Sequence, residues 1–418
     1  MVRAWRLLAI ITVVLAALVG VATPSMANGT DYFVYSNFDT GLWGSYGVDG
    51  YVGQDGISRI IFYSLTGSGA TAYIYKVTIP PGSNPNMHPD NPEATGPIAP
   101  RTFTLEKTFD LGAYPSHFCE FYVDAANNII YLGAYVGIRK YVYDTGLGNY
   151  VYAGDVAPPS PMEEGYGTQS LAYNPATDTW YAGSIAWNGD PGVTLRDMWK
   201  YEGSQGPAGI WELAFQYTTP EGISSHHDGL EFVGGYLWLA DYQGDYIKQY
   251  SVNGTLIKAF WHQALGHELE GMGFGALGHF WCGSHGSIIT EFGGAGLGVQ
   301  TVNIDIKPWS YPNSINLRDN KGVIPVAILG NESLDVTSVD VTSLRFGPSK
   351  AKPTHDLTNP IVYGDHLQDV NGDGYIDLVS HYRTKDTGLT VGDTSACLIG
   401  ALNDSTPING CDSVRIVK

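Results

Sequence analysis

The sequence predicts an all-β protein, and three features carry that prediction. Gly, Tyr and Trp occur 53, 28 and 10 times in the 418 residues, whereas charged residues make up only 15%. This composition is typical of many short strands joined by tight turns, with aromatic side chains filling the space between sheets. Helical periodicity is nearly absent beyond the first residues, and one pattern of strands and turns recurs along the chain.

The recurring pattern consists of a polar residue, a hydrophobic strand, a turn and an aromatic-rich strand. Its clearest copy is DGLEFVGGYLWLAD, from Asp228 to Asp241. The five copies begin at Asp49, Cys119, Gln169, Asp228 and Glu270, so their starts are 70, 50, 59 and 42 residues apart. These intervals bracket the length of a four-stranded propeller blade. We therefore expect a five-bladed β-propeller, with a β-sandwich or an irregular all-β fold as the alternative.

The interval of 70 residues leaves the blade count open. It contains a Pro-rich insert between Pro80 and Pro100, which is either a long surface loop or part of a sixth blade. The last copy, by contrast, is one strand short. The strand-like segment from Asp31 to Ser36 can supply that strand, and pairing it with the last blade would close the ring and remove its exposed edges.

The chain divides into three predicted regions: a signal peptide at 1–27, the propeller at 28–300, and a small β-rich accessory module at 301–418. The apolar run from Leu7 to Val21 is shorter than the roughly 20 residues that span a bilayer, which favours a signal peptide over an uncleaved anchor. Small residues at Ser25 and Ala27 place cleavage before Asn28. No later segment is apolar and long enough to span a membrane. We expect a secreted protein, either extracellular or held at the cell surface.

The charge balance narrows the classes of partner. A net charge of −19 with only 22 Lys and Arg residues argues against nucleic acid, because few cations are present to neutralise phosphates. Cations, neutral sugars and peptides remain compatible with it. Four sequons, at Asn28, Asn253, Asn331 and Asn403, fit an exported glycoprotein.

The four cysteines fit an oxidising compartment. Cys397 and Cys411 are close in sequence and flank a turn-rich stretch, so we expect a disulfide between them. Cys119 and Cys282 lie in separate apolar strands, where they either pair or remain buried thiols.

Two resemblances agree with this organisation. Through phrases such as HELEGMG at 267–273 and GYLWLAD at 235–241, residues 31–298 resemble the secreted propellers of the streptogramin lyase and gluconolactonase groups. The resemblance implies the architecture, and it carries over no catalytic residue. Residues 302–418 resemble an accessory module found at the C-termini of exported archaeal and bacterial proteins. That likeness implies secretion or surface display and no chemistry of its own.

The clearest local motif is a calcium loop, DVNGDGYID, at 369–377. Side-chain oxygens occupy positions 1, 3, 5 and 9, a backbone carbonyl occupies position 7 and Gly374 allows the turn. The predicted Ca²⁺ ligands are Asp369, Asn371, Asp373, Tyr375 and Asp377. Ser380 stands where an EF-hand has its bidentate Glu, so we expect a loop embedded in strands that binds Ca²⁺ to stabilise the module.

A second constellation comes from aligning the blades. The first strand of each blade lines the central channel, so Asp49, Asp228 and Glu270 would share a small space there. Three close carboxylates cannot all stay ionised without a cation or protons. The alignment therefore predicts a second divalent cation, held in the channel by these three residues.

The residues leave open whether the protein is an enzyme. Two positions before three of the five blade starts stand His117, His226 and Glu268, which are the candidate catalytic residues. At an open channel mouth they could hold a metal or act as general acid and base in a lyase or lactonase. The leading hypothesis is a non-catalytic propeller that binds an extracellular ligand, glycan or partner protein. The alternative is a secreted metal-dependent lyase or hydrolase.

Overall fold

The computed structural model describes residues 32–417 except 67–68, 92–93, 114–117, 135, 162–169, 176, 184–194, 219–226, 242–245, 262–268, 294–298, 319–321, 332–333 and 404–405. The predicted signal peptide and its cleavage site therefore lie outside the described residues. Within the described part of the chain, no helix is both long and apolar enough to cross a bilayer.

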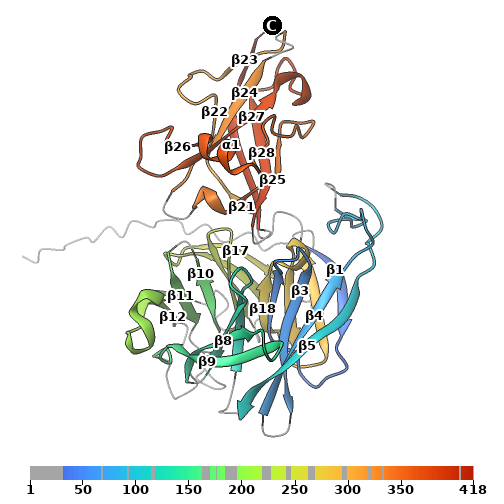
Figure 1. Cartoon of the computed structure of the whole chain (residues 1–418), viewed down its shortest axis with the longest axis vertical. Helices are drawn as coiled ribbons and strands as arrows, with labels where there is room; N and C mark the ends of the chain where they lie inside the picture. Colours follow the sequence, from blue (N-terminus) through green and yellow to red (C-terminus); the bar gives the residue numbers. More distant parts are fainter. Residues whose placement is uncertain are drawn as a thin grey trace, which may run out of the picture.

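The described residues of 33–293, coloured blue to yellow in Figure 1, form five antiparallel sheets of four strands each. Within each sheet the strands follow one another in sequence, except in the last, where β1, the first strand of the described residues, takes the outer edge. The sheets are β2 (Tyr46–Val52), β3 (Ser58–Thr66), β4 (Gly69–Thr78) and β5 (Thr102–Ala113); β6 (Phe118–Asp124), β7 (Ile129–Ala134), β8 (Gly137–Asp144) and β9 (Asn149–Ala157); β10 (Ala172–Asn174), β11 (Thr179–Gly183), β12 (Leu195–Glu202) and β13 (Glu212–Thr218); β14 (His227–Val233), β15 (Tyr236–Asp241), β16 (Tyr246–Ser251) and β17 (Leu256–Trp261); and β18 (Leu269–Phe274), β19 (Phe280–Ser284), β20 (Ile288–Gly293) and β1 (Phe33–Asp39).

The first strands of the sheets form a closed ring, which is the arrangement of a β-propeller. β2 contacts β18 and β6, β10 contacts β6 and β14, and β14 contacts β18. Five buried hydrophobic clusters lie between neighbouring sheets, one at each junction around the ring. Each sheet is therefore covered on both faces, which explains why β3 reads as the nearly unbroken apolar run Ile60, Ile61, Phe62, Tyr63.

Glycine lets the inner strands approach one another closely. A Cβ atom on Gly273 of β18 would lie 2.3 Å from the Cα atom of Asp49 on β2. A Cβ atom on Gly229 of β14 would lie 2.9 Å from the backbone nitrogen of Met272 on β18. The high glycine content thus serves close strand packing at the centre of the ring as well as turns.

The ring is closed as the sequence predicts. β1 pairs with β20 in an antiparallel register that sets Val34 opposite Phe292. The Pro-rich insert lies between β4 and β5 of a single sheet, and no sixth sheet appears among the described residues of 33–293. The backbone carbonyl oxygen of Asn86, in this insert, accepts a hydrogen bond of 3.4 Å from the hydroxyl of Tyr35 on β1. The insert is therefore packed against the closing sheet.

A buried ion pair fastens the insert to that sheet. Glu291 of β20 accepts hydrogen bonds from Arg101 at 2.8 and 2.9 Å, and it also lies 2.7 Å from Nδ1 of His279. The side chains of these three residues are at most 2% exposed. The ring of Tyr35 stacks on His279 with centroids 4.1 Å apart. His279 is thus part of the contact that closes the ring.

Residues 300–417 form two further four-stranded sheets around a core of their own. Figure 1 shows these strands in orange and red, with the short helix α1 (Pro360–Asp365) beside them. The core includes Ile304, Val326, Phe346, Leu378 and Leu398, which come from both sheets. The strands are β21 (Gln300–Thr301), β29 (Pro407–Ser413), β28 (Ser395–Leu402) and β25 (Val339–Phe346) in one sheet; β22 (Ile304–Ile306), β24 (Val323–Ile328), β27 (Asp377–Arg383) and β26 (Leu367–Gln368) in the other; and the pair β23 (Ser314–Asn316) with β30 (Arg415–Val417).

The cysteine predictions have separate outcomes. Cys397 and Cys411 lie opposite each other on β28 and β29 and form the predicted disulfide. Cys282 on β19 is a buried free thiol, so the structure favours the thiol alternative over a bond to Cys119.

Candidate functional site

Three acidic residues gather where the inner strands meet. Glu120 of β6 reaches across the ring: its Oε2 atom accepts hydrogen bonds from the backbone N–H groups of Met272 on β18 and Leu230 on β14, at 3.3 and 3.4 Å. Asp49 of β2 accepts a hydrogen bond of 2.8 Å from the N–H group of Val123. Both side chains are buried, and the carboxylate of Glu120 connects β6 to the inner strands of two other sheets.

The third member of this group is Glu231 of β14. Its carboxylate accepts hydrogen bonds from the N–H groups of Phe232 and Phe274, at 2.7 and 3.2 Å. Its charge acts on Glu120, as does that of Asp49. The other oxygen of Glu120, Oε1, is buried and has no hydrogen-bond partner among the described residues. We call Asp49, Glu120 and Glu231 the central carboxylates.

Burial dominates the electrostatics of the central carboxylates. Removal from water raises the pKa of Asp49 to about 8, against the hydrogen bonds from Val123 and Gly50, which lower it. Removal from water also raises the pKa of Glu120 well above its ordinary value, and the negative charges of Glu231 and Asp49 raise it further. The ring centre therefore favours carboxyl groups that keep a proton, or a cation that replaces the proton.

The structure places the predicted channel residues differently from one another. Asp49 belongs to the central carboxylates. Asp228 lies on β14, but its side chain lies outside the described residues. Glu270 faces His285, with 2.6 Å between its Oε1 atom and Nδ1 of the imidazole. Glu120, the residue after the Cys119 position of the alignment, is the one that reaches the ring centre.

β-Bulges explain this change of register. The pairing of every long inner strand shifts near the aligned positions: between Tyr46 and Asp49, Phe118 and Phe121, His227 and Gly229, and Leu269 and Met272. A bulge adds one residue to one strand and so reverses which face the following side chains take. Strict alternation from the blade starts therefore misses Glu120 and Glu231. An acidic residue within an otherwise apolar strand, such as Glu120 in FCEFYVD, is the sequence signal that could have identified these residues.

The candidate catalytic residues His117, His226 and Glu268 all lie outside the described residues. The nearest described feature of this kind is the pair formed by Glu270 and His285. The His285 side chain is 46% exposed, and its ring lies beside the rings of Trp43 and Tyr46. A carboxylate that orients an exposed imidazole is an arrangement that general-base chemistry can use.

A pocket of about 240 Å³ lies between the first two sheets. Arg59 forms one wall and pairs with both Asp55 and Glu106, at 2.8 and 2.5 Å. These ion pairs and hydrogen bonds lower the pKa values of both carboxyl groups. Lys107 lies 5.0 Å from the centre of the Tyr143 ring. The pocket is thus lined by aromatic side chains and by equal numbers of positively and negatively charged side chains.

The predicted calcium loop is an exposed turn between β26 and β27. The carboxylate of Asp369 accepts N–H hydrogen bonds from Gly372 and Gly374, at 2.7 and 3.0 Å. Asp373 accepts one from Tyr375 at 2.9 Å, and its other oxygen accepts one from the amide of Asn371. Each carboxylate oxygen has two lone pairs, so one lone pair on each remains for a cation.

Asp377, the last predicted side-chain ligand, has a different environment. It is fully buried, and its two oxygens accept hydrogen bonds from the N–H groups of Gly330 and Val370, both at 2.8 Å. In this structure Asp377 anchors the base of the loop to a neighbouring strand. The exposed oxygens of Asp369, Asn371 and Asp373 are of the hard type that Ca²⁺ prefers, so these residues fit the ion.

Comparison with known proteins adds a distant likeness of fold. No protein-family model and no curated protein matches the sequence. The PQQ-bound aldose sugar dehydrogenase of Streptomyces coelicolor is 14% identical, with 62% of this chain and 97% of that chain covered and a TM-score of 0.34. Sqt1 of Chaetomium thermophilum is 11% identical, with 63% and 98% covered and a TM-score of 0.34. The WD40 propeller domain of Doa1 is 10% identical, with 63% and 96% covered and a TM-score of 0.32.

Proposed function

We propose that this chain is a secreted or cell-surface five-bladed β-propeller protein that binds an extracellular ligand, with a C-terminal module stabilised by Ca²⁺. The observation that carries the proposal is the buried contact of Glu120 with the inner strands of two other sheets. The carboxylate of Glu120 accepts hydrogen bonds from backbone N–H groups of two other sheets. This contact gives the ring centre a structural role, because it holds three sheets together. A propeller built in this way offers its surface and the clefts between blades to a partner.

The pocket between the first two blades is the proposed place for the ligand. Its charges balance, since two cations, Arg59 and Lys107, and two carboxylates, Asp55 and Glu106, line it, so an ionic ligand gains little from it. Tyrosine faces beside planar polar groups suit a neutral molecule rich in hydroxyl groups. The proposed ligand class is therefore carbohydrate, among the ligand, glycan and protein partners that the sequence allows.

Binding of soluble oligosaccharides tests this assignment. We expect a glycan array to yield a ligand for the wild-type protein, and Tyr143→Ala to weaken its affinity at least about tenfold, because one stacked aromatic face is worth about 1.4 kcal/mol. Tyr152→Ala is the matched control, since Tyr152 lies on the same sheet and is exposed outside the pocket. If the Tyr143→Ala variant bound the glycan with the affinity of the wild-type protein, the glycan would bind outside this pocket. The absence of any glycan ligand would contradict the carbohydrate class.

Calcium is expected to stabilise the C-terminal module. An ion that binds the folded state at 100 times its Kd adds about 2.7 kcal/mol, so one calorimetric unfolding transition should rise by several degrees with Ca²⁺ and fall back with chelator. Asp373→Ala is expected to abolish this shift. Asp386→Ala, which removes an exposed carboxylate of the same module, is expected to leave it unchanged. A shift that survives Asp373→Ala would place the ion elsewhere.

The pair of Glu270 and His285 favours one alternative, a metal-dependent lyase or hydrolase. The pair supplies an imidazole held by a carboxylate. Lactone and glycoside substrates should be tested with and without divalent cations, with His285→Gln alongside. Turnover that disappears in the variant would support the enzyme, and no turnover by the wild-type protein would count against it.

A further inference from the structure

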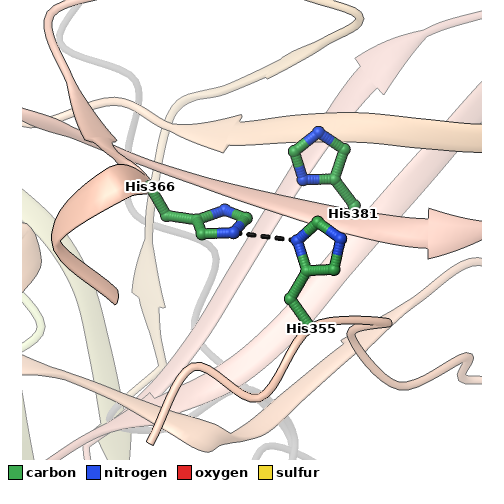
Figure 2. Close-up of side chains that lie close together, drawn as sticks. All are labelled: His355, His366 and His381. Carbon is green, nitrogen blue, oxygen red and sulfur yellow. Dashed lines mark hydrogen bonds between the residues drawn. The ribbon is translucent and has the colours of Figure 1, made fainter. Parts of the chain in front are cut away.

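Three histidines of the C-terminal module bring their rings together, although they come from three different segments of it. His355 lies in the segment before α1, His366 directly follows α1, and His381 lies on β27. One nitrogen from each ring lies within 4.8 Å of the other two. Figure 2 shows the three rings facing a common space, with a hydrogen bond between His355 and His366.

Hydrogen bonds fix the orientation of the His366 imidazole. Nδ1 of His366 lies 2.5 Å from the carbonyl oxygen of Val379. A carbonyl only accepts, so Nδ1 carries the proton, and in the neutral ring Nε2 is the nitrogen that carries the lone pair. This Nε2 atom lies 2.9 Å from Nδ1 of His355. A histidine whose second nitrogen is held by a backbone carbonyl is the usual form of a metal-ligating imidazole.

The third imidazole, that of His381, has a buried nitrogen whose hydrogen-bonding capacity is unsatisfied within the described part of the chain. Nδ1 of His381 is buried and has no hydrogen-bond partner among the described residues. The ring of His381 lies beside both other rings, with centroids 5.1 Å from His355 and 5.2 Å from His366. Neutral imidazole is the form that binds metal ions. A buried nitrogen without a partner costs free energy that a metal bond at this position would offset.

We propose that His355, His366 and His381 form a binding site for a borderline transition-metal ion of the Zn²⁺ class. Zn–N bonds of about 2.0–2.1 Å at tetrahedral angles place ligand nitrogens about 3.3 Å apart, so small ring movements bring the cluster into range. His366 is buried, whereas His355 is exposed. The ion would therefore have three protein ligands and one side open to water or to a group from a partner molecule.

This site is separate from the calcium loop but adjoins it. His366 precedes the loop and His381 follows it, and the N–H group of Val379 donates to the carbonyl oxygen of His366 at 2.9 Å. The backbone and the side chain of His366 thus both bond to Val379 across the base of the loop. Oxygen ligands select Ca²⁺ in the loop and nitrogen ligands select Zn²⁺ at its base.

Titration with Co²⁺, a spectroscopic substitute for Zn²⁺, tests the site in the mature chain without an affinity tag. The protein is stripped with chelator and then saturated with Ca²⁺, so that the loop does not compete. We expect one equivalent of Co²⁺ to bind with the visible absorption of a four- or five-coordinate ion, and one equivalent of Zn²⁺ to displace it. X-ray absorption of the Zn²⁺ form should show histidine nitrogens at about 2.0 Å.

Substitutions decide whether the three histidines are the ligands. His355→Ala changes an exposed side chain and is expected to weaken Zn²⁺ binding at least about 100-fold, because a lost direct ligand costs no less than the roughly 10–100-fold of a lost outer-shell partner. His381→Gln should have a comparable effect. Asp386→Ala is the control in the same module, and it should retain full affinity because its carboxylate is exposed and outside the cluster. Binding by the wild-type protein no tighter than by His355→Ala, or no stoichiometric binding at all, would overturn the proposal.

Discussion

Replacing Glu291 with alanine is expected to lower the free energy of unfolding by about 3–5 kcal/mol, because the guanidinium of Arg101 would stay buried without its counter-charge. Burial raises the pKa of Glu291, but hydrogen bonds and charges from His279 and Arg101 outweigh it, so the net pKa is lowered. A lowered folded-state pKa means that the ion pair stabilises the protein above the unfolded-state pKa. That stabilisation is lost as the pH falls through the folded-state value.

Urea unfolding at neutral pH, followed by tryptophan fluorescence, measures this effect. Glu106→Ala is the matched control, because Glu106 also pairs with an arginine but its side chain is 22% exposed. The control is expected to cost about 1 kcal/mol or less. We also expect proteolysis within the Pro-rich insert to speed up in Glu291→Ala alone. If the two variants lose the same stability, the buried ion pair does not fasten the ring.

Glu120→Gln is expected to stabilise the protein at neutral pH and to leave its stability unchanged near pH 4. The folded-state pKa of Glu120 is raised well above 4.5, mainly by burial. The folded state therefore keeps a proton that the unfolded state releases, and stability falls as the pH rises between the two pKa values. Glutamine resembles the protonated acid and removes this slope, so the difference between variant and wild type should grow from about pH 4.5 upward.

Two further variants sharpen the measurement. Glu120→Ala removes the acceptor for two buried N–H groups and leaves a cavity, so it should cost about 3–5 kcal/mol at every pH. Asp49→Asn should remove the part of the slope between about pH 3.8 and about 8. A divalent cation at the ring centre would give the opposite results. Glu120→Gln would then destabilise the protein at neutral pH, and chelator would destabilise the wild-type propeller.

The repeated sheets could be predicted from the sequence because they follow local patterns. Each blade contains a polar start, an apolar strand and a turn. The segment from Asp31 to Ser36 has the sequence of one more such strand, so its place in the last sheet could be inferred. The disulfide of Cys397 and Cys411 could be inferred for a similar reason, since two adjacent strands carry it.

The candidate sites depend on geometry that local patterns do not contain. A bulge of one residue decides whether Cys119 or Glu120 reaches the ring centre. The three metal-binding candidates come from a loop, a helix end and a strand, and only the folded module brings His355 beside His366 and His381. The role of Glu291 depends on Arg101, which lies 190 residues away. In each case a tertiary contact decides the chemistry.

The pairing of β1 with β20 has a consequence for the order of folding. The two strands that complete one sheet are separated by nearly the whole ring, with Ser36 bonded to Glu291 across 255 positions. Contacts of such high sequence separation form late and slow the folding rate. Until β1 docks, the edge of β20 is open to pairing with another chain. We therefore expect refolding to be slow and sensitive to protein concentration, with aggregation competing against closure of the ring.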